Sequence, residues 1–418
     1  MKNSSIPWIG EIPEKWKTDS IGSLYSLRTE KVSDKDYCPL SVGKMGVVPQ
    51  LENIAKTDAG NNRKLVKVGD FAINSRSDRR GSCGISAYEG SVSHINMIIT
   101  PRSEMYPQYY NWLFHTELFA DEFYKWGHGI VDDLWTTRWQ EMKRISIVLP
   151  PLTEQRLIAD FLDRKCAEID EMIALQEEMI NELNAYKQSV ITETVTHGIV
   201  PNTPMKDSGI EWIGVIPKRW EITKIKYLSD GLTDGTHDTF KQTEHGRFLL
   251  SSKNVRDTEL QITDNEFMIS ESDYNSVICN GFPQKNDLLL CCIGASIGRC
   301  IIYQYDEIYA FQRSVIFIRC NKRILPSLLR YNLLSSNSIL QESFLINQSA
   351  QAGLYQGQVK EILVIVPPLS EQRDIADYLD EKCAEIDALI TLKNAKINEL
   401  KYYKKSIIYE YVTGKKEV

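Results

Sequence analysis

A block of 26 residues occurs twice in this chain of 418 residues. Residues 150–175 recur 217 positions later at 367–392, and 19 of the 26 residues are identical. A second pair of matching segments, WIGEIPEKW at 8–16 and WIGVIPKRW at 212–220, lies only 204 positions apart. The chain is therefore an internal duplication whose second insert is 13 residues longer than the first.

The inserts between the matching segments share little beyond general α/β patterning. Each contains short β-type runs between turn-rich loops, with helical stretches near 107–126 and 326–345. Each predicts a compact α+β domain whose last strand runs into a double proline. The expected strands are 66–68, 71–73, 95–99 and 145–149 in the first insert, and 248–250, 287–293, 300–303, 315–318 and 362–366 in the second.

The repeated block predicts a long helix after each double proline. Thr153 is the expected N-cap, and apolar residues then recur at spacings of three, four and seven. His197-Gly198 is expected to end the first helix. Neither helix, at about 28 residues, can bury its apolar stripe alone, so we expect the two to pair as an antiparallel coiled coil with approximate two-fold symmetry.

The predicted fold class is α+β, with two α/β-type domains alternating with the two long helices. The matching segments at 8–16 and 212–220 are interpreted as hydrophobic plugs that seat each domain. The predicted domains are 1–152 and 201–368, with helical regions at 153–200 and 369–418.

Composition excludes several classes of protein. No apolar run reaches 18 residues and the first residues lack the apolar core of a signal peptide, so we expect a cytoplasmic protein without a membrane span. The nine cysteines show no C-x-x-C spacing, which favours reduced thiols and no metal site. Gly294-x-x-x-Gly298 lacks the Lys-Ser/Thr of a phosphate loop. Neither double proline is preceded by Asp, Asn or Ser and followed by an aromatic residue, which is the arrangement that amino-group methyltransferases place against the target base. We expect no catalysis and no cofactor in this chain.

The net charge of −7 argues at first against a nucleic-acid partner. However, residues 153–197 carry −6 and residues 369–418 carry −1, so the two inserts are neutral as a pair. Basic faces on the inserts therefore remain possible.

Polar loops of the inserts provide candidate contacts to DNA. Arginine pairs with guanine edges, asparagine and glutamine with adenine, and serine, lysine and arginine with phosphate. Any single one of these residues can instead belong to an ordinary solvated loop. The candidates are Ser75, Arg76, Arg79, Arg80 and His128 in the first insert, and Thr236, His237, Lys253, Asn254, Ser296, Arg299, Gln348 and Gln356 in the second.

The repeated block provides a candidate docking surface. The prolines need no more explanation than a rigid exit from a strand, but a solvated face would not need the same charges twice. We therefore interpret the repeated charges as a partner surface presented twice. The candidates are Glu154, Gln155, Arg156, Glu168 and Asp170, and their counterparts Glu371, Gln372, Arg373, Glu385 and Asp387.

The Pro-Pro-Leu-x-Glu-Gln-x-x-Ile-Ala-x-x-Leu blocks, the Trp-Ile-Gly-x-Ile-Pro segments and Asp234-Gly235-Thr236-His237 closely resemble the specificity subunit of type I restriction-modification systems. The resemblance covers essentially the whole chain. Val68-Gly69-Asp70 and Lys285-Asn286-Asp287 are similar to that family's Gly-Asp-Ile-Leu stretch, although Asn286 departs from its usual glycine.

This resemblance implies that each insert is a target recognition domain that reads half of a split, asymmetric site in double-stranded DNA. It also implies that the helices set the spacer and dock two modification subunits, which carry S-adenosylmethionine and methylate adenine. Two restriction subunits would add ATP- and Mg²⁺-dependent translocation and cleavage. Because the inserts are near neutral, partner subunits would supply much of the phosphate contact.

The competing hypothesis is a non-catalytic coiled-coil adaptor without DNA specificity. An adaptor would account for the helices and the acidic surface. It gives no reason for two divergent inserts with polar, glycine-rich loops.

Overall fold

The computed structural model describes residues 1–50, 60–102, 105–129, 135–347 and 353–418. These residues form two compact units. Unit 1 comprises residues 1–177 and 394–418, and unit 2 comprises residues 178–393. The boundary between the units cuts both long helices, and the division into four domains stays a prediction.

The two predicted long helices are present and longer than expected. Helix α5 (Leu152–His197) has 46 residues and α10 (Leu369–Val412) has 44. Helix α5 begins one residue before Thr153, and the Gln155 amide donates to the carbonyl oxygen of Pro151 (3.0 Å), so the prediction of Thr153 as N-cap was wrong. The predicted end at His197 is confirmed, because Gly198 adopts a φ of +80° that favours glycine.

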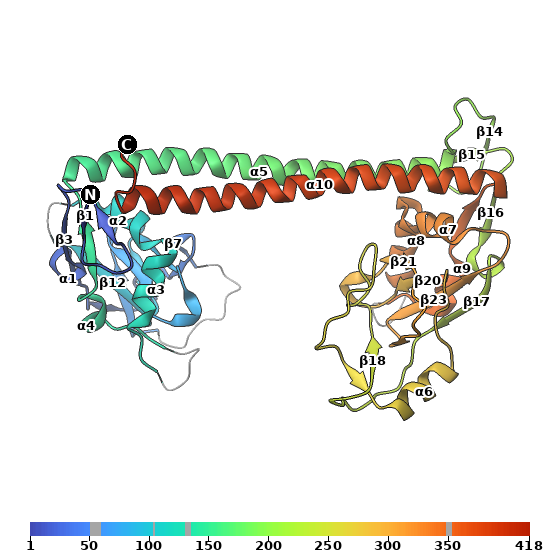
Figure 1. Ribbon diagram of the computed structural model, residues 1–418, viewed down its shortest axis with the longest axis horizontal. Coiled ribbons are helices and arrows are strands. Elements are labelled where there is room, and N and C mark those ends of the chain that lie inside the picture. The colour runs from blue at the N-terminus through green and yellow to red at the C-terminus, as the bar shows by residue number, and fades with distance from the viewer. Residues whose placement is uncertain (51–59, 103–104, 130–134, 348–352) are drawn as a thin grey trace. The chain divides into compact units, whose positions relative to one another are not determined.

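In each unit a stretch of α5 lies beside a stretch of α10 (Figure 1). As residue numbers rise along α5, the numbers of their partners on α10 fall, so the pairing is antiparallel as predicted. The contacts in unit 1 are Phe161–Tyr411 (ring centroids 4.4 Å apart) and Asp170–Lys404 (2.6 Å), and those in unit 2 are Met179–Lys393 (3.2 Å) and Lys187–Asp387 (2.7 Å).

The two inserts have the same topology. Each contains a four-stranded antiparallel sheet in the same strand order, two helices after it, and a strand pair that joins the start of the domain to its last strand. In unit 1 these are β10 (Cys83–Ile85), β9 (Phe71–Asn74), β12 (Asn96–Pro101) and β4 (Tyr25–Leu27), then α2 (Pro107–Phe114) and α3 (Glu117–Lys125), and the pair β13 (Ser146–Leu149) and β3 (Lys17–Ser20).

The counterparts in unit 2 follow the same sequence of elements. They are β21 (Cys300–Ile302), β20 (Leu288–Cys291), β23 (Val315–Cys320) and β17 (Ser229–Asp234), then α7 (Pro326–Leu334) and α8 (Ser336–Asn347), and the pair β24 (Leu363–Val366) and β16 (Glu221–Lys224). The inserts are therefore copies in fold although their sequences share little.

The extra residues of unit 2 lie in one segment. The offset between equivalent strands is 204 at the start of β4 and β17, and 217 at the start of β9 and β20. The 13 additional residues of unit 2 therefore lie between β17 and β20, the strands equivalent to β4 and β9. In unit 1 this segment contains β5 (Lys31–Val32), the hairpin β6 (Leu40–Gly43) and β7 (Gly46–Pro49), and β8 (Arg63–Val66); in unit 2 it contains β18 (Arg247–Leu250), β19 (Met268–Ile269) and α6 (Glu271–Cys279).

The remaining elements are short. In unit 1 they are β1 (Lys2–Asn3), β2 (Glu11–Ile12), α1 (Ile21–Leu24), η1 (Ser77–Arg79), β11 (Gly90–Val92) and α4 (Trp139–Met142). In unit 2 they are β14 (Met205–Asp207), β15 (Val215–Pro217), η3 (Ile225–Tyr227), η4 (Gly294–Ser296), β22 (Ala310–Phe311) and α9 (Gln356–Glu361).

Each predicted helical stretch is two helices rather than one. Thr116 accepts a hydrogen bond from the Phe119 amide (3.2 Å) and so caps α3 just after α2 has ended. In unit 2, Ser335 lies between the end of α7 at Leu334 and the start of α8 at Ser336. The predicted strand at 66–68 also differs, because β8 ends at Val66 and Gly69 turns the chain with a φ of +87°.

The Gly-Asp and Asn-Asp segments form equivalent turns before the central strands. Gly69 and Asn286 both have a positive φ (+87° and +75°), a conformation that asparagine tolerates better than most residues. The aspartate that follows is buried and holds an arginine with two hydrogen bonds. Asp70 binds Arg28 (2.7 and 2.9 Å), and Asp287 binds Arg319 (3.0 and 2.8 Å).

We expect Asp287→Ala to lower the free energy of unfolding by about 3 kcal/mol, because it leaves Arg319 and the backbone amide of Gln284 without their buried partner. Urea denaturation of the full chain measures this change. Asp306→Ala is the matched control, because Asp306 pairs with Lys285 at the surface with 89% of its side chain exposed. A loss as small as that of the control would contradict a structural role for Asp287.

All nine cysteines are free thiols, and burial raises the pKa of Cys83 and Cys292 to about 12. Among the described residues, no helix is both long and apolar enough to cross a membrane.

Candidate nucleic-acid interface

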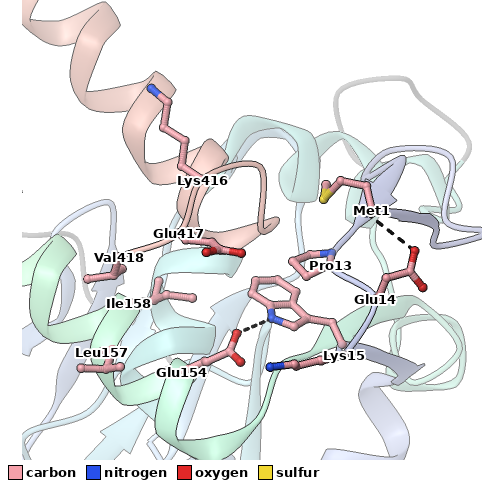
Figure 2. A pocket seen from close by; sticks show the side chains of 11 residues that line it. Met1, Pro13, Glu14, Lys15, Glu154, Leu157, Ile158, Lys416, Glu417 and Val418 are labelled. Atoms are coloured by element: carbon pink, nitrogen blue, oxygen red, sulfur yellow. Dashed lines mark hydrogen bonds and ion pairs between the residues drawn. The ribbon is translucent and has the colours of Figure 1, made fainter.

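The opening segment of each unit is locked to the repeated block by a tryptophan. Trp16 Nε1 donates to Glu154 Oε2 (2.6 Å) and, at the equivalent place, Trp220 Nε1 donates to Glu371 Oε2 (2.8 Å). Both tryptophans are 1% exposed, so the ends of these segments are plugs as predicted, whereas Trp212 at the start of the second segment is 43% exposed. Figure 2 shows the pocket of about 530 Å³ in unit 1, with Glu154 and Ile158 of α5 on one side and Pro13 on the other.

The repeated glutamines lie inside the units. Gln155 and Gln372 are 1% and 0% exposed. Gln155 accepts from the Tyr106 amide (2.8 Å) and donates to the Pro150 carbonyl (2.8 Å), while Gln372 accepts from the Leu325 amide (2.8 Å) and donates to the Pro367 carbonyl (2.9 Å). These two candidates for docking therefore fasten the start of each long helix to its own domain.

The other docking candidates lie on the helix surface. Arg156 and Arg373 are exposed. Two pairs of carboxylates form ion pairs at repeat-equivalent positions. Glu168 binds Lys165 (2.9 Å) and Glu385 binds Lys382 (2.7 Å) within one helix, whereas Asp170 and Asp387 bind Lys404 and Lys187 between helices.

Apolar side chains next to these carboxylates are exposed in both copies of the block. Met172 and Leu175 are 42% and 48% exposed, and their repeat equivalents Leu389 and Leu392 are 47% and 66% exposed. Glu168, Met172 and Leu175 are spaced i, i+4 and i+7, so they lie on one face of α5. We call this set, with Glu385, Leu389 and Leu392 in unit 2, the repeated helix face.

The candidate DNA-binding loops of the two units occupy the same place in the fold. The loop between β9 and β10 contains η1, and the loop between β20 and β21 contains η4. The helical turns η1 and η4 start 217 residues apart in the sequence, so Arg79 corresponds to Ser296 and Arg80 to Ile297. The same loop therefore carries three arginines in unit 1 and one, Arg299, in unit 2, where the other residues are small or apolar.

In unit 1 the structure brings most candidates together. Arg76 and Arg79 lie 3.1 and 3.7 Å from Asp78, and Arg80 pairs with Asp121 above the ring of Tyr124. Arg76 and His128 both form a β-bridge to Thr136, which places His128 beside the loop. Ser75 is different, because it is buried and its hydroxyl donates to the carbonyl of Ile95.

In unit 2 the candidates divide into two groups. One group gathers around Asp234, which contacts His237 Nε2 (2.8 Å) and Gln356 Nε2 (3.4 Å), while the Thr236 hydroxyl accepts from the Asp238 amide.

The second group lies around β18 and its following loop. Lys253 pairs with Glu266 (2.7 Å), Arg299 with Asp257 (3.3 Å), and the Asn254 side chain is buried against the backbone of Ser251 and Gln261. Ser296 lies in η4 at the tip of the loop, and Gln348 lies outside the described residues.

A buried carboxyl group lies behind the loop of unit 2. Glu342 on α8 is 4% exposed, and its Oε1 has no hydrogen-bond partner among the described residues. Its Oε2 lies 2.8 Å from the position that a Cβ on Gly298 would occupy. Burial raises the pKa of Glu342 to about 7, from 4.5.

We expect Glu342 to make the chain less stable as the pH rises from about 4.5 to 7. In that window the unfolded chain has released this proton and the folded chain still holds it, so raising the pH favours unfolding. Glu342→Gln should therefore stabilise the chain by on the order of 3 kcal/mol at pH 8 and by much less at pH 5. Urea denaturation of both proteins at the two pH values measures this, and an equal difference at both would contradict the burial of a protonated carboxyl.

The sequence did not identify several residues that lie beside the loop of unit 1. Lys44, Arg63, Ser93 and Asn96 line a cavity together with Ser77 and the arginines of the loop. The sequence contains no specific signal for Arg63, whose Nη2 donates to the Leu40 carbonyl (3.5 Å) of the hairpin β6–β7, which the sequence did not predict.

Residues 236–402 match the family described as "Type I restriction modification DNA specificity domain". Two similar proteins come from Methanocaldococcus jannaschii. The type I restriction enzyme MjaVIII specificity subunit is 28% identical over 283 residues, covering 65% of this chain and 62% of the relative. The putative MjaX specificity subunit is 22% identical over 434 residues, covering 97% and 95%. The chain is thus similar to type I restriction specificity subunits.

Another specificity subunit, that of the type I restriction enzyme EcoBI from Escherichia coli, is 25% identical over 267 residues, covering 60% of this chain and 55% of the relative. The chain thus matches less than two thirds of the MjaVIII and EcoBI specificity subunits, and nearly all of the MjaX one.

Solved structures share the fold over nearly the whole chain. A chain of the structure described as "Structural basis underlying complex assembly and conformational transition of the type I R-M system" has a TM-score of 0.72 at 15% identity, covering 96% of this chain and 98% of that one. The HsdS subunit from Thermoanaerobacter tengcongensis has a TM-score of 0.50 at 16% identity, covering 97% and 98%. This likeness confirms the predicted fold class.

Proposed function

We propose that this chain is a type I restriction specificity subunit that reads a bipartite, asymmetric site in double-stranded DNA, one half-site with each unit. One observation supports this most directly. The loops at 76–82 and 293–299 occupy the same place in two copies of one fold, yet their side chains differ. If the loops only closed a turn, they would not need three arginines in one copy and a single arginine in the other. Unlike side chains in equivalent loops are what two unlike half-sites require.

The repeated helix face is proposed to dock the partner subunits. Its charges and apolar side chains occur once in each unit, so the chain offers two equivalent surfaces for two modification subunits. Exposed apolar residues beside charges are typical of protein interfaces. Two restriction subunits are the further proposed partners. S-adenosylmethionine, ATP and Mg²⁺ would bind to these partners in the cytoplasm, and this chain would remain non-catalytic.

Co-expression with a modification subunit, followed by sequencing of methylated adenines in the host DNA, tests the proposal. We expect a stable complex and methylation in a single bipartite motif. The adaptor hypothesis expects association with a partner but no sequence motif. Absence of both association and methylation would contradict the proposed function.

A further inference from the structure

A cationic cavity in unit 1 lies between the hairpin β6–β7 and the loop that contains η1. It has a volume of about 770 Å³. Among the described residues, five cationic side chains and one carboxylate line it, in a chain whose net charge is −7. The charged residues that line the cavity are Lys44, Arg63, Arg76, Arg79, Arg80 and Asp78.

Arg63 is the buried cation of this cavity. It is 5% exposed, and its Nε and Nη2 donate to the hydroxyl and the carbonyl of Ser91 (both 2.9 Å). Among the described residues, Arg63 has no carboxylate within the 4 Å of an ion pair. Burial lowers the pKa of its guanidinium, and the charge of the more distant Asp34 opposes this shift only in part. A buried cation without a directly bound counter-ion is unfavourable, so this site favours an anionic ligand.

Three buried side-chain oxygen atoms that line the same cavity have no hydrogen-bond partner within the described part of the chain. They are Ser77 Oγ, Ser93 Oγ and Asn96 Oδ1. Asn96 as a whole is only 5% exposed, and its amide donates to the Ser93 carbonyl (3.3 Å). Buried polar atoms in native proteins are nearly all hydrogen-bonded, so three such atoms around one cavity indicate that a polar ligand completes it.

We propose that this cavity binds one phosphate group of the DNA backbone beside the first half-site, with Arg63 as the counter-ion and the Ser77 and Ser93 hydroxyls as donors. The inference rests on the proposed function, because it assumes that unit 1 contacts DNA. A phosphate fits better than a base edge, since the guanidinium and the two hydroxyls can donate to its oxygens and the charge excess suits an anion. Asn96 Oδ1, an acceptor, would bind through a bridging water.

The variants Ser77→Ala and Ser93→Ala separate ligand binding from stability. Each removes a hydroxyl that has no hydrogen-bond partner among the described residues, so the unfolding temperature of the free chain should stay the same or rise. The affinity of the complex with modification subunits for a duplex that contains the motif should fall about 3- to 10-fold. Ser86→Ala is the matched control, because its buried hydroxyl donates to the Tyr88 carbonyl (2.7 Å) and its loss should lower stability without changing the affinity for DNA.

Arg63→Met tests the charge. The slope of log K against log salt should decrease in magnitude by about 0.9, the value for one phosphate contact, and the affinity should fall equally for all sequences. Single methylphosphonate substitutions along the duplex then identify the phosphate. One position should weaken binding by the unaltered complex and have a clearly smaller effect on Arg63→Met, which has lost the charge that pairs with that phosphate. Inorganic phosphate at matched ionic strength distinguishes a free phosphate, which would raise the unfolding temperature of the unaltered chain but not that of Ser93→Ala.

The outcomes separate the inference from the proposed function. If the unaltered complex binds no duplex, both fail. If it binds the motif and the Ser77, Ser93 and Arg63 variants keep its affinity and its salt slope, the cavity holds only water and the inference alone fails. If the variants lose affinity but every methylphosphonate affects the unaltered complex and Arg63→Met alike, the cavity contacts bases and the phosphate assignment is wrong.

Discussion

Replacing Arg79 and Arg80 with alanine is expected to change the methylation motif in one half-site and to leave the other half-site unchanged. Both guanidinium groups are exposed and lie in the loop that follows the central strand of unit 1. An arginine that binds a base edge contributes about 1–3 kcal/mol of discrimination, so each substitution should relax one base position and lower affinity about 10-fold or more. Arg80 must first leave Asp121, which reduces its net contribution.

Sequencing of methylated adenines after expression of each variant with the modification subunit measures this effect. The structure provides a matched control, because Ser296 occupies the place of Arg79 in unit 2. Ser296→Ala should affect only the other half-site. If both arginine variants keep the full motif, the loop at 76–82 is structural and the bases are read elsewhere in unit 1.

The sequence was sufficient to predict the helices because their signal is repeated. The apolar stripe and the double proline occur twice, and each copy supports the interpretation of the other. The underestimated length has a plain cause. Residues 152–197 and 369–412 contain neither glycine nor proline and are rich in strong helix formers, so nothing ends the helix where the apolar pattern becomes thinner.

The common fold of the two inserts could not be predicted from the sequence. The equivalent segments 71–85 and 288–302 share few residues because a buried sheet needs only apolar side chains of suitable size, which many sequences supply. The turn that needs a positive φ is formed by Gly69 in one copy and by Asn286 in the other. The two inserts thus share the same structural requirements, although different residues satisfy them.

The candidate site was predictable only at the level of loops. The sequence located Arg79 and Arg80 correctly in an exposed loop, but it could not separate polar residues that face solvent from those that satisfy the backbone. Ser75 and Asn254 are of the second kind, as are Gln155 and Gln372 in the repeated block. Repetition of a residue therefore indicates a shared requirement, which in these glutamines is the attachment of a helix to its domain.

Introducing glutamate at the exposed apolar positions of the repeated helix face is expected to remove modification subunits one at a time. Leu389→Glu with Leu392→Glu should leave one subunit bound, through the intact face of unit 1. The same change at Met172 and Leu175 should leave the other, and all four substitutions together should leave none. Two buried carboxylates without partners would cost an interface several kcal/mol, whereas the free chain should keep its stability because all four side chains are exposed.

Native mass spectrometry of the co-purified complexes counts the subunits directly, and methylation of host DNA should decrease with them. Ala174→Glu and its repeat equivalent Thr391→Glu are the controls, because both are exposed but lie on another side of the helix from the repeated helix face. Stepwise loss with the face variants and full occupancy with the controls would assign one docking surface to each copy of the block. If the four-fold variant still binds two modification subunits, the repeated apolar residues are not the docking surface, and the repetition of Met172 and Leu175 as Leu389 and Leu392 requires another cause.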